Sequence, residues 1–260
     1  MKKRIIIEKN VGETPLAALT AWKRGNPAYA HIPASYAGRL DPMARGKLLI
    51  LLGDECKKQK HYTNLDKEYE IEVLLDMGSD TGDVLGLPEY PRTETSVTQN
   101  ILRTTLRNER GVHRRSYPPF SSKTVNGKPL FLYALEGTIG DITIPEHDEQ
   151  IYNISLQRIA TISSDTLAAS VREFLAKVPK SDEPSKQLGA DFRVKEISEC
   201  WEAILKDVGP RSFTVLSLRV TCGSGTYMRS LAGRIGEALG TRGLALSINR
   251  TKIGKYWKWW

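Results

Sequence analysis

Residues 35–46 read Ser-Tyr-Ala-Gly-Arg-Leu-Asp-Pro-Met-Ala-Arg-Gly and hold a single acid, Asp41, among glycine, basic and apolar residues. Arg39 and Arg45 flank Asp41, and a glycine lies on either side of it. Residues 47–53 then form an apolar run of strand length that ends on glycine. The sequence therefore predicts that Asp41 lies in a glycine-hinged loop directly before a buried strand.

The Asp41-Pro42 dipeptide has two interpretations. In the ordinary one, the aspartate caps a helix whose first residue is proline. In the other, the neighbouring arginines favour the ionised carboxylate, which then serves as a catalytic group. Capping aspartates are far commoner than catalytic ones, so the choice between the two depends on the rest of the chain.

The composition is that of a globular protein. Of the 260 residues, 40% are hydrophobic and 26% are charged, and there is no apolar run long enough to cross a membrane. The cysteines Cys56, Cys200 and Cys222 are far apart and have no metal-ligand spacing, which favours a reduced, cytoplasmic compartment and no metal. We expect one domain over residues 1–260, with no membrane segment.

The formal net charge of +8 favours an anionic partner, most often nucleic acid, although solubility alone is the simpler explanation. The distribution of charge strengthens the first interpretation. Residues 101–130 contain one acid, Glu109, and seven basic residues: Arg103, Arg107, Arg110, Arg114, Arg115, Lys123 and Lys128. Such clustering is typical of phosphate binding.

The order of elements predicts an α+β fold. The periodicity predicts strands at residues 5–7, 67–75, 151–162, 212–222 and 244–253. Capping residues predict helices that begin after Thr14, Asp54, Ser96, Asp165 and Thr226, and another helix covers residues 194–205.

Two further residues are candidates for chemistry. Tyr69 lies on a strand with charged neighbours, although taken alone an ordinary strand tyrosine is the much commoner explanation. Arg229 falls in the first turn of its helix, where the helix dipole disfavours a cation. A carboxylate such as Asp41 would compensate Arg229; the alternative is an exposed arginine with a small penalty.

Six stretches resemble, in the same order, motifs of the TruB-type tRNA pseudouridine synthases. Residues 8–14 resemble D-K-P-x-G-x-T, residues 38–46 G-x-L-D-P-x-A-x-G, residues 67–69 K-x-Y, residues 80–86 D-T-x-D-x-x-G, residues 117–122 P-P-x-[YF]-S-A with one residue missing, and residues 225–231 G-T-Y-I-R-S-L. The similarity covers nearly the whole chain.

The resemblance implies a mixed, mostly antiparallel central sheet with flanking helices and a catalytic cleft. It implies that Asp41 is the nucleophile or base, that Arg229 pairs with it, and that Tyr69 contacts the target base. The substrate-binding candidates are Tyr36, Arg39, Lys67, Arg114, Arg115, Tyr227 and Ile248. The implied activity is isomerisation of the T-arm uridine of tRNA, position 55, through a flipped-out base, by a monomer that needs no cofactor.

The chain also departs from the family pattern. Tyr36 and Ala37 stand where the family usually has His and Thr, so base recognition is expected to differ. We expect no C-terminal PUA-like RNA-binding domain, and Trp257, Trp259 and Trp260 either cover core surface or stack on RNA. Two alternatives remain: a synthase that depends on a guide RNA, and a non-catalytic RNA-binding or tRNA-folding module on the same fold.

Overall fold

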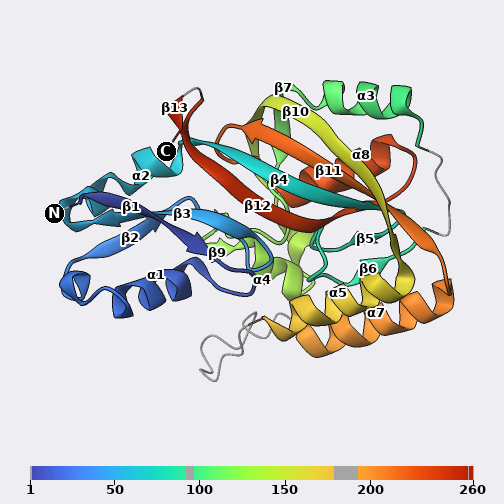
Figure 1. The fold of residues 1–260 in the computed structure, drawn as a ribbon, viewed down its shortest axis with the longest axis horizontal. Coiled ribbons are helices and arrows are strands. Elements are labelled where there is room, and N and C mark those ends of the chain that lie inside the picture. Colours follow the sequence, from blue (N-terminus) through green and yellow to red (C-terminus); the bar gives the residue numbers. More distant parts are fainter. Residues whose placement is uncertain (1, 92–96, 179–192, 257, 260) are drawn as a thin grey trace.

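The computed structural model describes residues 2–91, 97–178, 193–256 and 258–259, which form a large sheet flanked by helices (Figure 1). The sheet strands are β1 (Arg4–Lys9), β2 (Ala34–Ala37), β3 (Arg45–Leu52), β4 (Asp66–Leu75), β7 (Gly111–Ser116), β10 (Glu146–Ser163), β11 (Ser212–Cys222), β12 (Gly243–Lys255) and β13 (Lys258–Trp259). Two short hairpins pair β5 (Gly78–Ser79) with β6 (Pro88–Glu89), and β8 (Thr124–Val125) with β9 (Lys128–Pro129).

The helices lie around this sheet. They are α1 (Pro15–Arg24), α2 (Gln59–Thr63), α3 (Gln99–Asn108), α4 (Leu130–Leu135), α5 (Ser164–Ala176), α7 (Val194–Val208) and α8 (Met228–Ala238). Short 3-10 helices are η1 (Pro27–Tyr29), η2 (Gly53–Lys58) and η3 (Ile139–Asp141).

The strand order is β1-β3-β12-β4-β11-β10-β7, with β2 on β3 and β13 on β12. Every pair in the sheet is antiparallel except β3–β12, which pair in parallel at Asn249↔Arg45 and Arg250↔Gly46. The predicted mixed, mostly antiparallel sheet is confirmed. This parallel β3–β12 pair joins the N-terminal strands to the rest of the sheet, at the residues that follow the Asp41 loop.

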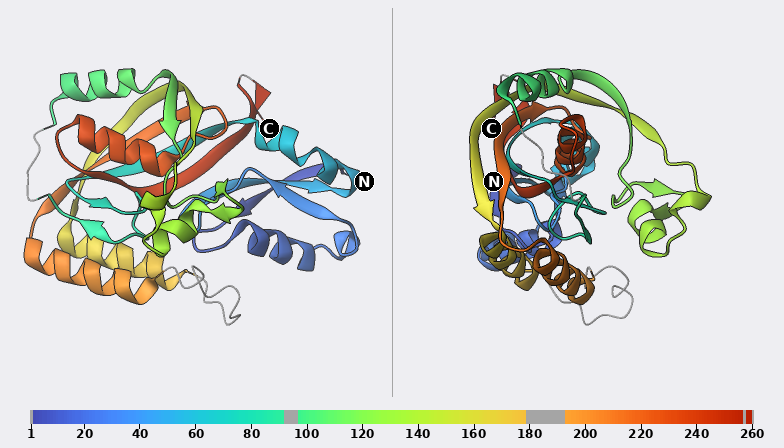
Figure 2. Two further views of the ribbon diagram at one scale, coloured as in Figure 1. Left: turned by 180° about the vertical axis from the view of Figure 1, so that it is seen from behind. Right: turned by 90° about the vertical axis from the view of Figure 1, so that its right-hand side faces the viewer.

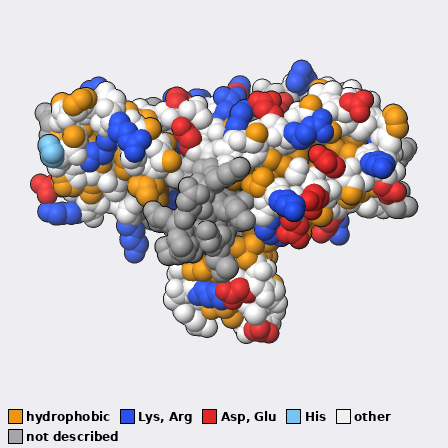
Figure 3. All heavy atoms as spheres, turned by 90° about the horizontal axis from the view of Figure 1, so that it is seen from below, with side chains coloured by type: hydrophobic (Ala, Val, Ile, Leu, Met, Phe, Trp, Pro, Cys, Tyr) orange, Lys and Arg blue, Asp and Glu red, His pale blue; other side chains and the backbone are white. Residues whose placement is uncertain are grey.

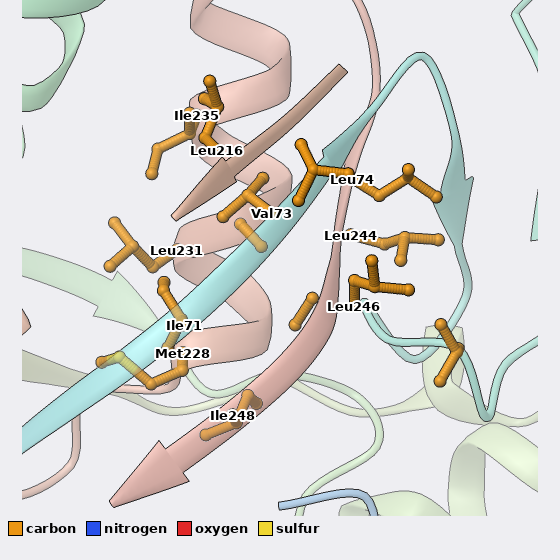
Figure 4. Packing of buried hydrophobic residues seen from close by; sticks show 14 of the residues in the cluster. Ile71, Val73, Leu74, Leu216, Met228, Leu231, Ile235, Leu244, Leu246 and Ile248 are labelled. Atoms are coloured by element: carbon orange, nitrogen blue, oxygen red, sulfur yellow. The ribbon is translucent and has the colours of Figure 1, made fainter. Parts of the chain in front are cut away.

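Helix α8 packs on one face of the sheet because its apolar residues recur at helical spacing. Met228, Leu231 and Ile235 face Ile71 and Val73 of β4 in the core (Figure 4). All five are at most 4% exposed, so the start of α8 is held firmly against the strand that carries Tyr69.

The other face of these strands carries ion pairs, such as Glu70–Arg219 at 3.0 Å and Glu68–Lys252 at 3.1 Å. A strand with one apolar and one charged face explains the alternation seen in the sequence.

Residues 117–145 form a separate small unit that projects from the body (Figure 2, right). It contains the β8–β9 hairpin, and Asn126 and Gly127 both have positive φ, at 50° and 79°, as a type I′ turn requires. Asn-Gly between two short strands is a common sequence for such a hairpin turn.

Three predicted caps are wrong. Asp54 caps no helix, because it lies in the first turn of η2, whose N-cap residue is Leu52. Helix α5 is capped by the Ser163 hydroxyl rather than by Asp165, which lies in its first turn. Helix α8 begins after Tyr227, and the hydroxyl of Thr226 bonds to the carbonyl of Gly223 instead. At α5 and α8 a competing local hydrogen bond decided the boundary. Ser96 and the side chains of Trp257, Trp259 and Trp260 lie outside the described residues.

Candidate active site

A cavity of about 580 Å³ opens where the loop before β3, the strand β4 and the start of α8 meet. Eight of the ten residues proposed from the sequence line it: Tyr36, Arg39, Asp41, Lys67, Tyr69, Tyr227, Arg229 and Ile248. The space-filling view of one face of the molecule shows basic side chains across this face, with acidic ones denser toward the α5–α7 end (Figure 3).

Asp41 and Arg229 form an ion pair across the cavity wall. Nε of Arg229 lies 2.7 Å from Oδ2 of Asp41, although 188 positions separate the two residues. The Arg229 side chain is only 5% exposed, whereas that of Asp41 is 42% exposed. The pair therefore consists of a buried, fixed cation and a carboxylate that stays accessible from the cavity.

The orientation of Arg229 is fixed by two main-chain carbonyls as well as by Asp41. Its Nη2 donates to the carbonyl of Phe120 at 2.9 Å, and its Nη1 donates to the carbonyl of Thr81. Because the N–H donors of a guanidinium lie in one rigid plane, Arg229 cannot turn without breaking several of these charge-assisted bonds. These contacts offset the unfavourable position of the Arg229 cation at the start of helix α8.

A second carboxylate, Asp83, lies beside the same guanidinium. Its Oδ2 is 3.5 Å from Nε of Arg229, and its Oδ1 accepts from Thr81 Oγ1 and from the amide of Leu85. Burial raises the pKa of Asp83 to about 6, against the opposing effect of Arg229. Sequence reasoning did not select Asp83 as a site residue, although the stretch 80–86 that carries it stood out.

The loop that carries Asp41 is held by cations that bind its carbonyls. Lys9 donates to Ala44 at 2.6 Å and to Pro42 at 3.4 Å. Arg250 donates to the carbonyls of Gly38, Arg39 and Lys47, at 3.0, 3.3 and 2.7 Å.

Lys9 and Arg250 are both 1% exposed, and burial lowers the pKa of Lys9 to about 8.

Asp41 begins a turn, which is closed by a hydrogen bond from the amide of Ala44 to the carbonyl of Asp41, and it caps no helix. The capping interpretation of Asp41-Pro42 is thus excluded.

Tyr69 and Lys67 reach the cavity from the same face of β4. Burial raises the pKa of Tyr69, and the nearby Arg250 only partly offsets this effect, so its phenol is neutral near pH 7. The ammonium of Lys67 donates to the carbonyls of Thr63 and Leu65, and burial lowers its pKa to about 8. Lys67 thus supports the cavity wall with its charge turned to the main chain.

The remaining cavity residues form its rim and sides. Tyr227 is the residue before α8, and burial raises its pKa to about 12. Ile248 on β12 is buried, Tyr36 on β2 is half-buried, and Arg39 is exposed.

Arg114 and Arg115 lie outside the cavity on β7. The Arg114 side chain is 61% exposed and pairs with Glu146 and Asp148, at 3.3 and 3.2 Å. Arg115 lies 3.6 Å from Glu109. These two residues belong to a surface beside the cavity.

Within the described ranges, the structure places no three His, Cys, Asp or Glu side chains where they could jointly hold a metal ion. The same part of the chain contains no helix with the length and apolar character needed to span a membrane.

Comparison with known proteins identifies the family. Residues 29–172, more than half of the chain, match the model described as TruB family pseudouridylate synthase (N terminal domain). The chain belongs to this family. The matched segment includes Asp41, Tyr69 and Asp83.

Curated relatives carry the name tRNA pseudouridine synthase B. The protein from Azoarcus sp. (strain BH72) is 28% identical over 97% of this chain and 65% of its own length. The protein from Deinococcus radiodurans is 29% identical over 85% of this chain and 65% of its own length. The protein from Caldicellulosiruptor saccharolyticus is 26% identical, and only 58% of its length is matched. The chain thus spans about three fifths of these relatives.

Solved structures show the same fold. A Cbf5-Nop10-Gar1 complex has a chain with a TM-score of 0.55 and 15% identity, over 96% of this chain and 48% of the other. A chain in an H/ACA RNP bound to a substrate RNA containing 2'-deoxyuridine has a TM-score of 0.51 and 16% identity, over 96% of this chain and 47% of the other.

Proposed function

We propose that this chain is a tRNA pseudouridine synthase that isomerises the T-arm uridine at position 55, with Asp41 as its catalytic carboxylate. The observation that carries the proposal is the 2.7 Å contact between Arg229 Nε and Asp41 Oδ2 on the wall of the cavity. Family membership supports the reaction class, and the name of the relatives supports tRNA as the substrate.

The reaction rearranges bonds within one nucleotide. The bond between N1 of uracil and C1′ of the ribose breaks, the base turns, and C5 bonds to C1′ in its place. C5 loses a proton and N1 gains one, so atoms and charge balance with no redox step and no cofactor.

Asp41 acts on the nucleotide as nucleophile or base, and both roles need the ionised carboxylate. Arg229 engages Oδ2, and we assign the attack on the nucleotide to Oδ1.

Tyr69 and Ile248 are proposed to hold the base. Tyr69 is neutral near pH 7 because burial raises its pKa, which favours packing on uracil over action as a phenolate. If Tyr69 also helps to remove the C5 proton of uracil, it does so through its neutral hydroxyl group. Replacement of Tyr69 by Phe would separate the two roles, because Phe retains the ring and loses the hydroxyl.

The target uridine must leave its stack to reach Asp41, at a cost of a few kcal/mol. A cavity of about 580 Å³ has the size of a small-molecule site, which supports entry of a flipped nucleotide. Tyr36, Arg39 and Tyr227 line the path, and Arg114 and Arg115 are assigned to RNA phosphates outside it. We propose a cytoplasmic monomer whose partner is the T arm of tRNA.

Pseudouridine mapping by reverse-transcription stops tests this function. Unmodified tRNA is incubated with wild type, with Asp41→Ala, and with Asp54→Ala, a control at a side chain that is 92% exposed. We expect a new T-arm stop with wild type and the control, and none with Asp41→Ala. RNA binding without a stop from wild type would favour the binding module, and a stop that requires an added guide RNA would favour the guide-dependent enzyme.

A further inference from the structure

The connection between β10 and β11 is much longer than the sheet requires. The two strands are antiparallel neighbours whose register runs to Ser163↔Ser212, so a short turn would be enough to join them. Instead the chain leaves the sheet at Ser164, forms α5 and α7, and returns at Arg211 (Figure 1). Within this excursion, one described side chain lines the active-site cavity, that of Arg193.

The backbone at Arg193 is strained. Its φ of 55° and ψ of 31° lie in the left-handed region, which side chains other than glycine and asparagine rarely adopt. Arg193 also occupies the N-cap of α7, where its side chain makes no capping bond. The stability of helix α7 therefore does not account for an arginine at this position.

The side chain of Arg193 joins two separate segments of the site. Its Nη2 lies 2.7 Å from Oδ2 of Asp80, and its guanidinium lies over the ring of Phe120, 5.0 Å from the centroid. The side chain is 22% exposed. Its charge and its planar face are therefore both engaged by protein groups.

The two segments are those that hold Arg229. Phe120 supplies the carbonyl for Nη2 of Arg229, and Thr81, the residue after Asp80, supplies the carbonyl for Nη1. Residue 120 belongs to the projecting unit, and residue 81 belongs to the loop after β5. A change in the spacing between these segments would pull the two carbonyls away from the guanidinium.

Helix α7 is attached to the same loop at a second point. Trp201, which is 1% exposed, donates from its indole nitrogen to the carbonyl of Val84 at 3.2 Å. The excursion thus contacts the 80–86 loop through both Arg193 and Trp201.

We propose that the α5–α7 excursion supplies a positioning residue, Arg193, which clamps Asp80 to Phe120 and thereby fixes Arg229 against Asp41. This inference rests on the proposed function, because it assigns Arg193 to the same reaction. It requires Arg193 to act through the orientation of Arg229, with no contact to the RNA.

Arg193→Gly tests the clamp without a folding penalty from the backbone. Glycine adopts a φ of 55° freely, so this variant relieves strain while it removes the side chain. Arg193→Lys keeps the charge and loses the planar face. Lys195→Ala is the matched control, because Lys195 lies on the same helix and its side chain is 90% exposed.

Three quantities are measured for each protein: the single-turnover isomerisation rate on bound tRNA, the Kd for tRNA, and hydrogen exchange of the Arg229 Nε–H by NMR. The NMR resonance is assigned by its loss in Arg229→Lys. For Arg193→Gly we expect an isomerisation rate at least tenfold slower, exchange at least tenfold faster, and a Kd within twofold of wild type. Arg193→Lys should be intermediate in rate, and Lys195→Ala should match wild type.

Two results would overturn the clamp. One is a weaker Kd with an unchanged bound-state rate, which would make Arg193 an RNA contact. The other is unchanged rate and exchange in Arg193→Gly. If wild type formed no pseudouridine but Arg193→Gly still sped exchange at Arg229, the clamp would stand and the proposed function would fail.

Discussion

The guanidinium of Arg229 contacts two carboxylates, one exposed and one buried. Asp41 is accessible and lies 2.7 Å from Nε, whereas Asp83 is buried and lies 3.5 Å from it. Burial acts to lower the pKa of Arg229, but the two carboxylates together raise it, so Arg229 remains charged at any working pH. Asp83 is thus a buried partner of Arg229, while the Asp41 carboxylate stays accessible, as its proposed catalytic role requires.

The raised pKa of Asp83 predicts a pH-dependent stability. Its folded-state pKa of about 6 exceeds the ordinary aspartate pKa of 3.8, so folding is favoured by protonation. The stabilising effect is complete below pH 4 and is lost as the pH rises through 6, with a total on the order of 3 kcal/mol. Chemical denaturation of wild type and Asp83→Asn from pH 4 to 8 measures it.

We expect the free energy of unfolding of wild type, relative to Asp83→Asn, to fall across this window, because asparagine cannot ionise. A difference that is flat with pH, or that grows in favour of wild type above pH 6, would contradict the environment described for Asp83.

Arg114 is expected to contribute to RNA affinity and not to chemistry. Its pairs with Glu146 and Asp148 are exposed and therefore weak, so a phosphate competes with them readily. Arg114→Ala should lower the slope of log K against log salt by about 0.7–0.9, the value for one phosphate contact. The rate from bound RNA should not change.

The control for Arg114 is Arg219→Ala, another exposed arginine with an acidic partner, on the outer face of the sheet. A salt slope that stays the same in both variants would remove Arg114 from the RNA interface.

At the scale of elements, the sequence located the reactive groups better than their supports. The Asp41 loop and the Asp41–Arg229 pair could be predicted because a motif and a misplaced helix cation pointed to them. The roles of Lys9 and Arg250 could not be predicted, because both bind main-chain carbonyls, which every residue type carries. Asp83 was missed for a related reason: its burial arises only when α8 packs over its loop.

Gly46 is the point at which the chain that follows the Asp41 loop meets β12. It has a φ of 110°, and an added Cβ would lie 2.4 Å from the carbonyl oxygen of Arg250. Gly46→Ala should therefore cost about 3 kcal/mol or more of stability and should also reduce activity, because Arg250 holds the loop. Thermal and denaturant unfolding and the isomerisation rate provide the measurements.

Gly53 supplies the comparison, since it also has positive φ, at 60°, but has open space around it. Gly53→Ala should cost only about 1–2 kcal/mol, from backbone strain alone. Equal costs at the two glycines would mean that β3 and β12 are not as closely apposed as described.

The whole molecule joins an N-terminal part to a larger body through few strand pairs. β3 and β12 share only two register positions, and the Lys9, Arg250 and Asp41 contacts lie at the same junction. The sequence predicted the α+β class and most of the long strands, and the single domain stays a prediction. It could not predict the parallel β3–β12 pairing, because pairing between distant strands depends on the completed sheet.

We expect the N-terminal part and the larger body to unfold together, because the contacts at the β3–β12 junction couple them. Trp22 belongs to the N-terminal cluster and Trp201 to the main core, so each reports on one part once the other tryptophans, Trp257, Trp259 and Trp260 included, are replaced by Phe. The two resulting single-tryptophan variants should show coincident unfolding midpoints by fluorescence and circular dichroism. Adding Gly46→Ala should separate the midpoints. Separate transitions without that change would show that the two parts fold independently.

We propose that Asp41, held by Arg229, isomerises a uridine, and this reaction must release tritium from C5-labelled uridine in tRNA. Under single-turnover conditions, with all RNA bound, wild type should release tritium in step with pseudouridine formation. Asp41→Asn should bind the same tRNA and release none. Release by Asp41→Asn at the wild-type rate, or none from wild type with the RNA bound, would contradict the account.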